Sequence, residues 1–261
     1  MKEANNMTLN TYASRALQLC ALLSLCLINP GLAEGTQLAP AKDKKMLTAL
    51  SSITGIQSQE MTRDGADFLR EMAQAADNVK SYTFQSHMTV FKGDKSIEEN
   101  SRFYFKKPRQ LRAEELGPFK KGSVAVLLKN GKVRGHLGGL MSKFTATVDP
   151  DSEWVTSANG YPLVDSDFYG MSQVMINFVK QGKKSLVTES PVTVNGQPAP
   201  VYVLELYADA NKNELMKRAY IDPKTLLPVE WFDYKDGKLF AHTRWQDVRI
   251  NVDLSDSLFD I

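Results

Sequence analysis

Hydrophobic residues recur along this chain with two different periods, and the change of period separates helices from strands. Helical spacing over residues 64–80 is carried by Phe68, Leu69, Met72, Ala76 and Val79. The spacing returns over residues 165–181, at Phe168, Met171, Val174, Met175, Phe178 and Val179. Thr62 or Asp64 is available as the N-cap of the first helix, and Gly182 is a typical stop for the second. The pattern therefore predicts two amphipathic helices.

Elsewhere the period is two, which is the period of strands. Over residues 82–90, Tyr82, Phe84, Met88 and Val90 alternate with polar residues. Residues 97–106 place Phe103 and Phe105 on the side opposite to Arg102, Tyr104 and Lys106. Further strand-like segments cover 111–116, 124–129, 133–137, 186–194, 201–207, 217–222, 228–234 and 239–250. Turn signals between them, such as Asn130-Gly131, favour antiparallel hairpins, so about ten strands are predicted.

Long antiparallel strands that follow one another can bury an apolar face only if the sheet curls or closes. Two amphipathic helices are available to fill its concave side. We therefore predict an α+β fold over residues 63–261, a strongly curved antiparallel sheet (a half-open β-barrel) with two main helices on the concave side. Residues 34–62 are rich in Ala, Gln, Ser, Thr and Lys and are predicted to be a linker with one short helix near 43–50.

The first 33 residues have the pattern of a cleavable secretory signal. Arg15 precedes an apolar run over 16–28, Pro30 breaks the chain after it, and small residues follow up to Ala33. The run is too short to span a bilayer. We predict cleavage after Ala33, export to the periplasm, and no transmembrane segment in the mature chain.

Composition excludes several kinds of chemistry. Both cysteines lie in the predicted signal, so the mature chain offers no thiol for a disulfide or a metal. Lys and Arg number 32 against 30 Asp and Glu, without charged blocks, which argues against a nucleic-acid partner. The three histidines, His87, His136 and His242, show no ligand spacing. No metal and no cofactor is predicted.

Catalytic motifs are weak as well. The segment around His136, Gly135-His136-Leu137-Gly138-Gly139, is faintly like a lipase oxyanion loop, but no Gly-x-Ser-x-Gly elbow accompanies it. A glycine-rich hairpin end explains it better. Asp165-Ser166-Asp167 could bind a cation, yet it stands where the N-cap of the second helix belongs. A hydrolase of envelope polymers would need a clustered acid, base and nucleophile, so we predict that the chain is not an enzyme.

The order of these elements, together with the segment 102–112, resembles the LolA/LolB-like superfamily of envelope lipoprotein carriers. The matching residues are Phe103, Phe105, Lys107, Pro108 and Arg112. A closer likeness, through the motifs at 135–140, 161–163 and 227–230, is to a family of uncharacterised bacterial exported proteins within that superfamily. The resemblance covers roughly residues 64–260. It implies a half-open barrel whose helices form a lid over an apolar cavity.

One position departs from this pattern. The carriers have an arginine tied to gating before the proline, whereas this chain has Lys107. Lysine is a point charge without the planar fork of arginine, so the same hydrogen bonds to backbone carbonyls do not follow.

The resemblance implies a non-catalytic carrier for a lipid or a lipoprotein acyl chain. The residues predicted to line its cavity lie on the two helices and the first two long strands: Phe68, Met72, Phe84, Met88, Phe103, Phe105, Phe168, Met171 and Met175. Lys107, Arg109 and Arg112 are predicted to form a basic rim for a phosphate headgroup or an acidic partner.

The same residues have simpler interpretations. Apolar stripes usually fill a core, and charge runs are usually solvated surface. The alternative function is therefore an envelope protein-interaction or sensing module whose core is filled by its own side chains. The predicted partner is a lipid or an acylated protein in the first case and another envelope protein in the second.

Overall fold

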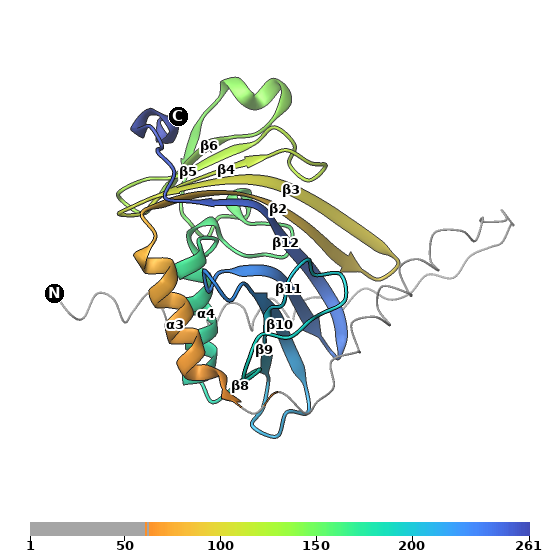
Figure 1. Cartoon of the computed structure of the whole chain (residues 1–261). Helices are drawn as coiled ribbons and strands as arrows, with labels where there is room; N and C mark the ends of the chain where they lie inside the picture. Colours follow the sequence, from red (N-terminus) through yellow and green to blue (C-terminus); the bar gives the residue numbers. More distant parts are fainter. Residues whose placement is uncertain (1–60, 62) are drawn as a thin grey trace, which may run out of the picture. The chain divides into compact units, whose positions relative to one another are not determined.

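The structure is a computed structural model that describes residue 61 and residues 63–261. The predicted signal peptide, the short helix near 43–50 and all of the linker except Met61 lie outside the described residues. Within them the chain forms one twelve-stranded sheet and two α-helices (Figure 1). The helices are α3 (Gly65–Asn78) and α4 (Phe168–Lys180).

The strands, in chain order, are β1 (Arg63–Asp64), β2 (Ser81–Lys92), β3 (Lys95–Lys106), β4 (Gln110–Glu115), β5 (Val124–Leu127), β6 (Val133–His136), β7 (Ala146–Val148), β8 (Lys184–Val187), β9 (Tyr202–Tyr207), β10 (Leu215–Ile221), β11 (Pro228–Lys235) and β12 (Lys238–Ile250). Four short 3₁₀ helices lie outside the strands of the described residues: η3 (Gly139–Lys143), η4 (Glu153–Val155), η5 (Leu163–Asp165) and η6 (Asp256–Phe259). No helix in the described part of the chain has the length and apolar character needed to span a membrane.

Every strand pairs with its neighbours antiparallel, in the order β1-β8-β9-β10-β11-β12-β2-β3-β4-β5-β6-β7. The pairing of β12 with β2 joins the last strands to the first long hairpin, while β1 and β7 remain at opposite edges. The sheet is therefore curved but not closed, with α3 and α4 packed on its inner side (Figure 1). The predicted α+β half-barrel is confirmed.

The inner face of the sheet and the helices share one main core. The sheet contributes rows of apolar side chains at matching register, one of which runs Tyr82, Phe105, Leu111, Leu127, Val133 and Val148. Phe68, Leu69 and Met72 of α3 and Phe168 and Met175 of α4 are almost fully buried against these rows. The period-two and helical patterns thus give the correct inward-facing residues.

The helix ends follow the capping chemistry expected from the sequence. The Asp64 carboxylate accepts a hydrogen bond from the Ala66 amide (2.8 Å), and the Asp167 carboxylate accepts one from the Gly170 amide (2.9 Å). Gly182 has φ +88° just after α4, a conformation that favours glycine. Helix α4 begins at Phe168 rather than at residue 165, because η5 occupies the residues before its cap.

Other differences from the prediction concern short elements. The strand predicted over 186–194 ends at Val187, and beyond it the pairing continues through a hydrogen bond from the Thr188 amide to the Val203 carbonyl (3.1 Å) and through the isolated Val192–Val201 bridge. Strands β1 and β7 have two and three residues, too few to show a period of two. These pieces form because a neighbouring strand supplies the hydrogen bonds.

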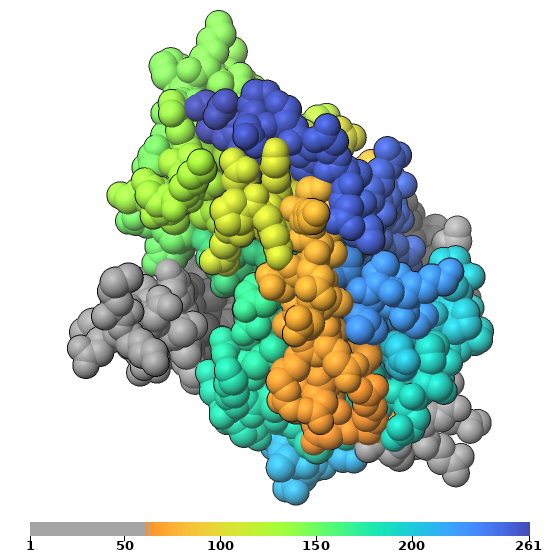
Figure 2. Space-filling model, turned by 60° about the vertical axis from the view of Figure 1, so that its left-hand side comes forward, coloured from red at the N-terminus to blue at the C-terminus, as the bar shows by residue number. Residues whose placement is uncertain are grey.

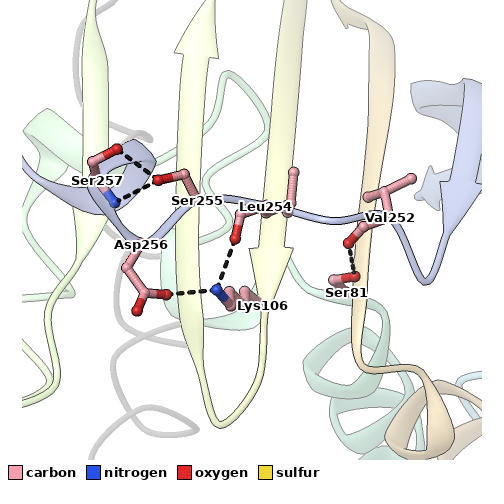
Figure 3. Close-up of polar contacts among 7 residues, drawn as sticks. All are labelled: Ser81, Lys106, Val252, Leu254, Ser255, Asp256 and Ser257. Carbon is pink, nitrogen blue, oxygen red and sulfur yellow. Dashed lines mark hydrogen bonds and ion pairs between the residues drawn. The ribbon is translucent and has the colours of Figure 1, made fainter.

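The C-terminal residues lie across the ends of β2 and β3 (Figures 2 and 3). The Ser81 hydroxyl donates to the Val252 carbonyl, and the Lys106 ammonium donates to the Leu254 carbonyl (2.7 Å) and pairs with Asp256 (Figure 3). These bonds attach the last residues of the chain to the first hairpin.

Candidate functional site

A cavity of about 220 Å³ lies between the inner face of β3–β7 and the connection from η3 to η5. The sheet contributes Phe103, Ala113, Val124, Ala125, Gly135 and Ala146 to its wall. The connection contributes Met141, Phe144, Trp154, Val155, Tyr161 and Leu163. Its lining is thus mainly apolar, as in small-molecule sites of other proteins.

The hollow follows from the size of the side chains at one register level of the sheet. Phe103 of β3 stands opposite Ala113, and the same level continues through Ala125, Gly135 and Ala146 on β5, β6 and β7. The neighbouring row, two residues away along each strand, has larger side chains that fill the space above the sheet: Leu111, Leu127, Val133 and Val148 on β4 to β7. Small residues at one level therefore leave space that no neighbouring side chain occupies.

Two glycines of the motif at 135–139 hold the backbone close to this wall. A Cβ atom on Gly138 would lie 1.9 Å from the Lys121 carbonyl oxygen, and one on Gly135 would lie 2.3 Å from the Val124 carbonyl oxygen. Any larger residue would push β6 and the turn after it away from β5. The motif thus serves close backbone packing, in line with the hairpin interpretation.

The mouth of the cavity is also apolar. Among the large hydrophobic residues exposed to solvent, Met141 (51%), Phe144 (67%) and Trp154 (60%) line the cavity, and Leu140 (94%) lies beside them on η3. Apolar surface therefore continues from the solvent into the interior. Clustered exposed apolar residues of this kind mark sites that bind another molecule.

Charged groups occupy the inner end of the same cavity. The Glu99 carboxylate, on a residue only 3% exposed, accepts a hydrogen bond from the Ala158 amide (2.6 Å). The Glu115 carboxylate accepts one from the Ser101 hydroxyl (2.7 Å). The Lys120 ammonium donates to the backbone carbonyls of residues 153, 154 and 156 at 2.8–3.2 Å, which attaches η4 to the connection between β4 and β5.

Burial changes the acidity of these groups. It raises the pKa of Glu99, and burial together with repulsion from Glu99 raises the pKa of Glu115 to about 7. Burial also lowers the pKa of Lys120, against the attraction of both carboxylates. Glu115 is therefore close to half ionised at neutral pH.

The raised pKa of Glu115 predicts that stability falls as the pH rises. Between pH 4.5 and about 7 the unfolded chain has already lost this proton while the folded chain still holds it, so ionisation favours unfolding. We expect wild type to lose about 1–3 kcal/mol more than Glu115→Gln over this range, from urea titrations at each pH. Equal losses in both proteins would contradict the assignment, and Glu98→Gln, an exposed change on β3, is the control.

A second cavity of about 70 Å³ adjoins the first and shares Glu99, Phe103 and Tyr161 with it. The Lys217 ammonium lies at its wall, where it is ion-paired with Asp233 and donates to the Tyr161 hydroxyl (3.1 Å). The ring of Trp231 lies 4.2 Å from the same ammonium. The Lys217 ammonium is thus paired in the wall of this smaller cavity, whereas the Trp231 indole nitrogen in the same wall has no hydrogen-bond partner among the described residues.

The residues predicted to line a cavity fall into two groups. Phe103 lines both cavities, and Phe84, Met88 and Met171 line the smaller one. The others lie in the main core and line neither cavity: Phe68, Met72, Phe105, Phe168 and Met175. For these five a role in ligand binding stays a prediction.

The three predicted rim residues connect parts of the fold. Lys107 donates to the Asp77 carbonyl at the end of α3, and Arg109 donates to the Val164 carbonyl before α4 (2.8 Å). Arg112 donates to the Leu258 carbonyl near the C-terminus (3.0 Å). Lys107 thus makes a backbone hydrogen bond without the arginine fork. None of the three lines either cavity, and their role as a rim stays a prediction.

Glu99, Glu115 and Lys120 were not among the predicted site residues. A signal for the two glutamates exists, because Glu99 has the strand parity of Phe103, and Glu115 has that of Leu111. A carboxylate at an inward position of an apolar strand is unusual and points to a site. No cluster of three or more His, Cys, Asp or Glu side chains suited to a metal ion occurs in the described part of the chain.

No family model and no curated protein matches the chain. Solved structures with a similar fold include a DUF1329 family protein from Desulfovibrio piger, with 15% identity, coverage of 75% of this chain and 95% of that chain, and a TM-score of 0.41. A LolA superfamily protein from Nitrosomonas europaea has 10% identity, 77% and 99% coverage, and a TM-score of 0.41.

A further similar structure is that of the Pseudomonas aeruginosa MucA/MucB complex, with 11% identity and a TM-score of 0.39. It covers 76% of this chain, and this chain spans 60% of the matched one. At such identities the likeness is one of fold alone.

Proposed function

We propose that this chain is an exported, non-catalytic protein that binds an apolar or amphiphilic ligand, such as a lipid or a lipoprotein acyl chain, in the larger cavity. The observation that carries the proposal is the apolar cavity that opens between exposed Met141, Phe144 and Trp154. Burial of hydrocarbon there contributes about 0.8 kcal/mol for each methylene removed from water. Binding of this kind needs no chemical step and is reversible.

The volume limits what can enter. An apolar cavity of about 150 Å³ is enough to bind benzene. At about 220 Å³ the larger cavity holds a short hydrocarbon segment rather than a whole lipid. The rest of a longer chain would lie over Phe144 and Trp154 at the mouth. Partial enclosure keeps affinity moderate, so a competing membrane or envelope protein could take the ligand away.

The location belongs to the same proposal. A signal peptide cleaved after Ala33 would deliver the chain to the periplasm, where lipids and acylated proteins must cross an aqueous space. The mass of the protein purified from a bacterial periplasm tests this directly, because cleavage at any other position would give a different N-terminus.

The cavity assignment predicts that filling the hollow abolishes ligand uptake. Ala125 lies in the middle of the small-residue level, so Ala125→Phe places a ring in the cavity. We expect the affinity for N-phenyl-1-naphthylamine, an apolar dye, to fall about tenfold or more in a fluorescence titration, equivalent to about 1.4 kcal/mol. Native mass spectrometry of the wild-type protein, prepared without detergent, would identify any molecule already bound.

The matched control is Thr147→Phe, which adds the same ring to an exposed residue outside the cavity. It should bind the dye as the wild type does. Equal binding by Ala125→Phe and the wild type would show that the dye enters elsewhere and would count against this cavity.

The interaction-module alternative has one observation in its favour. Five of the residues predicted to line a cavity pack in the main core and line neither of the two cavities, and Leu140, which is 94% exposed, lines neither of them either. An apolar residue so exposed is suited to contact with a partner protein. A wild-type protein that carries no bound molecule and takes up no dye would favour this second function.

A further inference from the structure

Three polar groups in the larger cavity are suited to a polar end on the ligand. The carboxylates of Glu99 and Glu115 come from adjacent strands β3 and β4, and both residues line the cavity. Ser123, also in its wall, is 8% exposed, and its hydroxyl has no hydrogen-bond partner among the described residues. A buried hydroxyl without a partner is costly unless another molecule supplies one.

These groups are close to one another through the backbone. The amide of Glu115 donates to the carbonyl of Ser123 (2.9 Å), so the two residues face each other across the start of β5. The hydrogen bond that the Glu115 carboxylate accepts from the Ser101 hydroxyl leaves further acceptor capacity on that carboxylate. The site therefore has more acceptors than donors.

The charge of the site points the same way. Lys120 is the one lysine or arginine in the described lining, and its ammonium already donates to three backbone carbonyls. When Glu99 and Glu115 are both ionised, one negative charge is left without a counterion. A cation at this place would relieve the repulsion between the two carboxylates.

We infer that the larger cavity binds a cationic amphiphile, a hydrocarbon chain that ends in a protonated primary amine, with the ammonium between Glu115 and Ser123. The inference rests on the proposed function and specifies its ligand. An ammonium offers three donors and no acceptor, which matches two carboxylates and a hydroxyl. A carboxylate headgroup would meet like charge in a partly dry site, and an alcohol would leave the charge uncompensated.

The inference includes a pH dependence. The titratable groups around Glu115 are Glu99 from β3, Lys120 from the connection before β5, Glu153 from η4 beside Lys120, and His136 from β6 in the same wall. Because the pKa of Glu115 is about 7, its carboxylate is mostly ionised at about pH 8 and mostly protonated at about pH 5.5. Preference for the amine is expected at the higher pH only.

The experiment compares dodecylamine, dodecanol and dodecanoate as competitors of the dye on the exported protein, below their micelle concentrations. At about pH 8, dodecylamine should bind about tenfold more tightly than dodecanol, and dodecanoate should bind most weakly. Glu115→Gln should lose the preference for the amine while its affinity for dodecanol is kept. Glu98→Gln, a change to an exposed residue on β3 outside both cavities, should keep the preference.

The outcomes separate the two proposals. If dodecanol binds as tightly as dodecylamine, or if Glu115→Gln keeps the preference, the amine inference is overturned while the carrier function stands. If none of the three compounds competes and the dye itself does not bind, both are overturned. Dodecylamine that binds equally well at about pH 5.5 and pH 8 would also exclude Glu115 as its partner.

Discussion

Phe168→Ala is expected to lower the free energy of unfolding by about 3–5 kcal/mol. Phe168 is fully buried at the start of α4, and its ring centroid lies 4.8 Å from that of Tyr82 and 5.0 Å from that of Phe84. Trp245 of β12 lies on another side at 6.3 Å. The ring thus joins the helix to strands from both halves of the chain, and its loss leaves a cavity that these elements cannot easily close. Urea unfolding measures the effect.

The control is Tyr169→Ala, the next residue of the same helix, which is 42% exposed. It should change stability by no more than about 0.5 kcal/mol. The sequence predicts that Phe168 lines the ligand cavity, and the structure shows its ring packed in the main core. A Phe168→Ala protein that keeps its stability but loses ligand binding would contradict the expected packing role and favour a role for Phe168 in ligand binding.

Phe168 illustrates how far a local pattern reaches. Its helical spacing correctly predicts that it faces inward. An inward side chain can border a cavity or pack against another side chain, depending on which residue lies opposite it. The residue opposite Phe168 is Tyr82, which is 86 residues away in the chain. Local periodicity contains no information about such a pair. The inward orientation of Phe168 was therefore predictable from the sequence, whereas the residues that pack against it were not.

The cavity could be predicted only in part from the sequence. Ala113, Ala125, Gly135 and Ala146 lie about one strand and one turn apart. They reach one level only after the register of each hairpin is fixed, and one step of register would turn each strand over. The Asn130-Gly131 turn gives one of these registers, but the connections before β5 and before β7 contain no comparable signal.

The basic residues show a second limit on what the local sequence pattern can predict. Strand alternation correctly separates Arg102, Tyr104 and Lys106 from the phenylalanines of β3. Lys106 nevertheless donates to the carbonyl of Leu254, 148 residues further along the chain, and Arg112 donates to the carbonyl of Leu258. Charged residues that bind distant backbone carbonyls have the same local pattern as solvated ones. Their partners follow from the fold and not from the strand.

Asp233→Asn is expected to cost about 3–5 kcal/mol, because it leaves a buried ammonium without its counterion. Lys217 and Asp233 stand opposite each other on β10 and β11, with side chains 5% and 15% exposed. Burial favours the neutral amine of Lys217, but the negative charge of Asp233 and the hydrogen bonds that the ammonium donates to Asp233 and Tyr161 outweigh it, so its pKa lies above the ordinary value. Chemical denaturation at neutral pH measures the loss.

The double variant Lys217→Met, Asp233→Leu distinguishes the energy of the pair from the cost of breaking it. With both charges removed, no buried charge is left unpaired and the Tyr161 hydroxyl loses one hydrogen bond, so the double variant should recover most of the stability that each single change loses. Losses that simply add would show that the two side chains act independently and that the ion pair does not hold β10 and β11 together. Recovery would mean that the Lys217–Asp233 ion pair is dispensable for folding. Because both residues line the smaller cavity, the role of the pair would then be to bind a ligand or to specify a unique fold rather than to stabilise the protein.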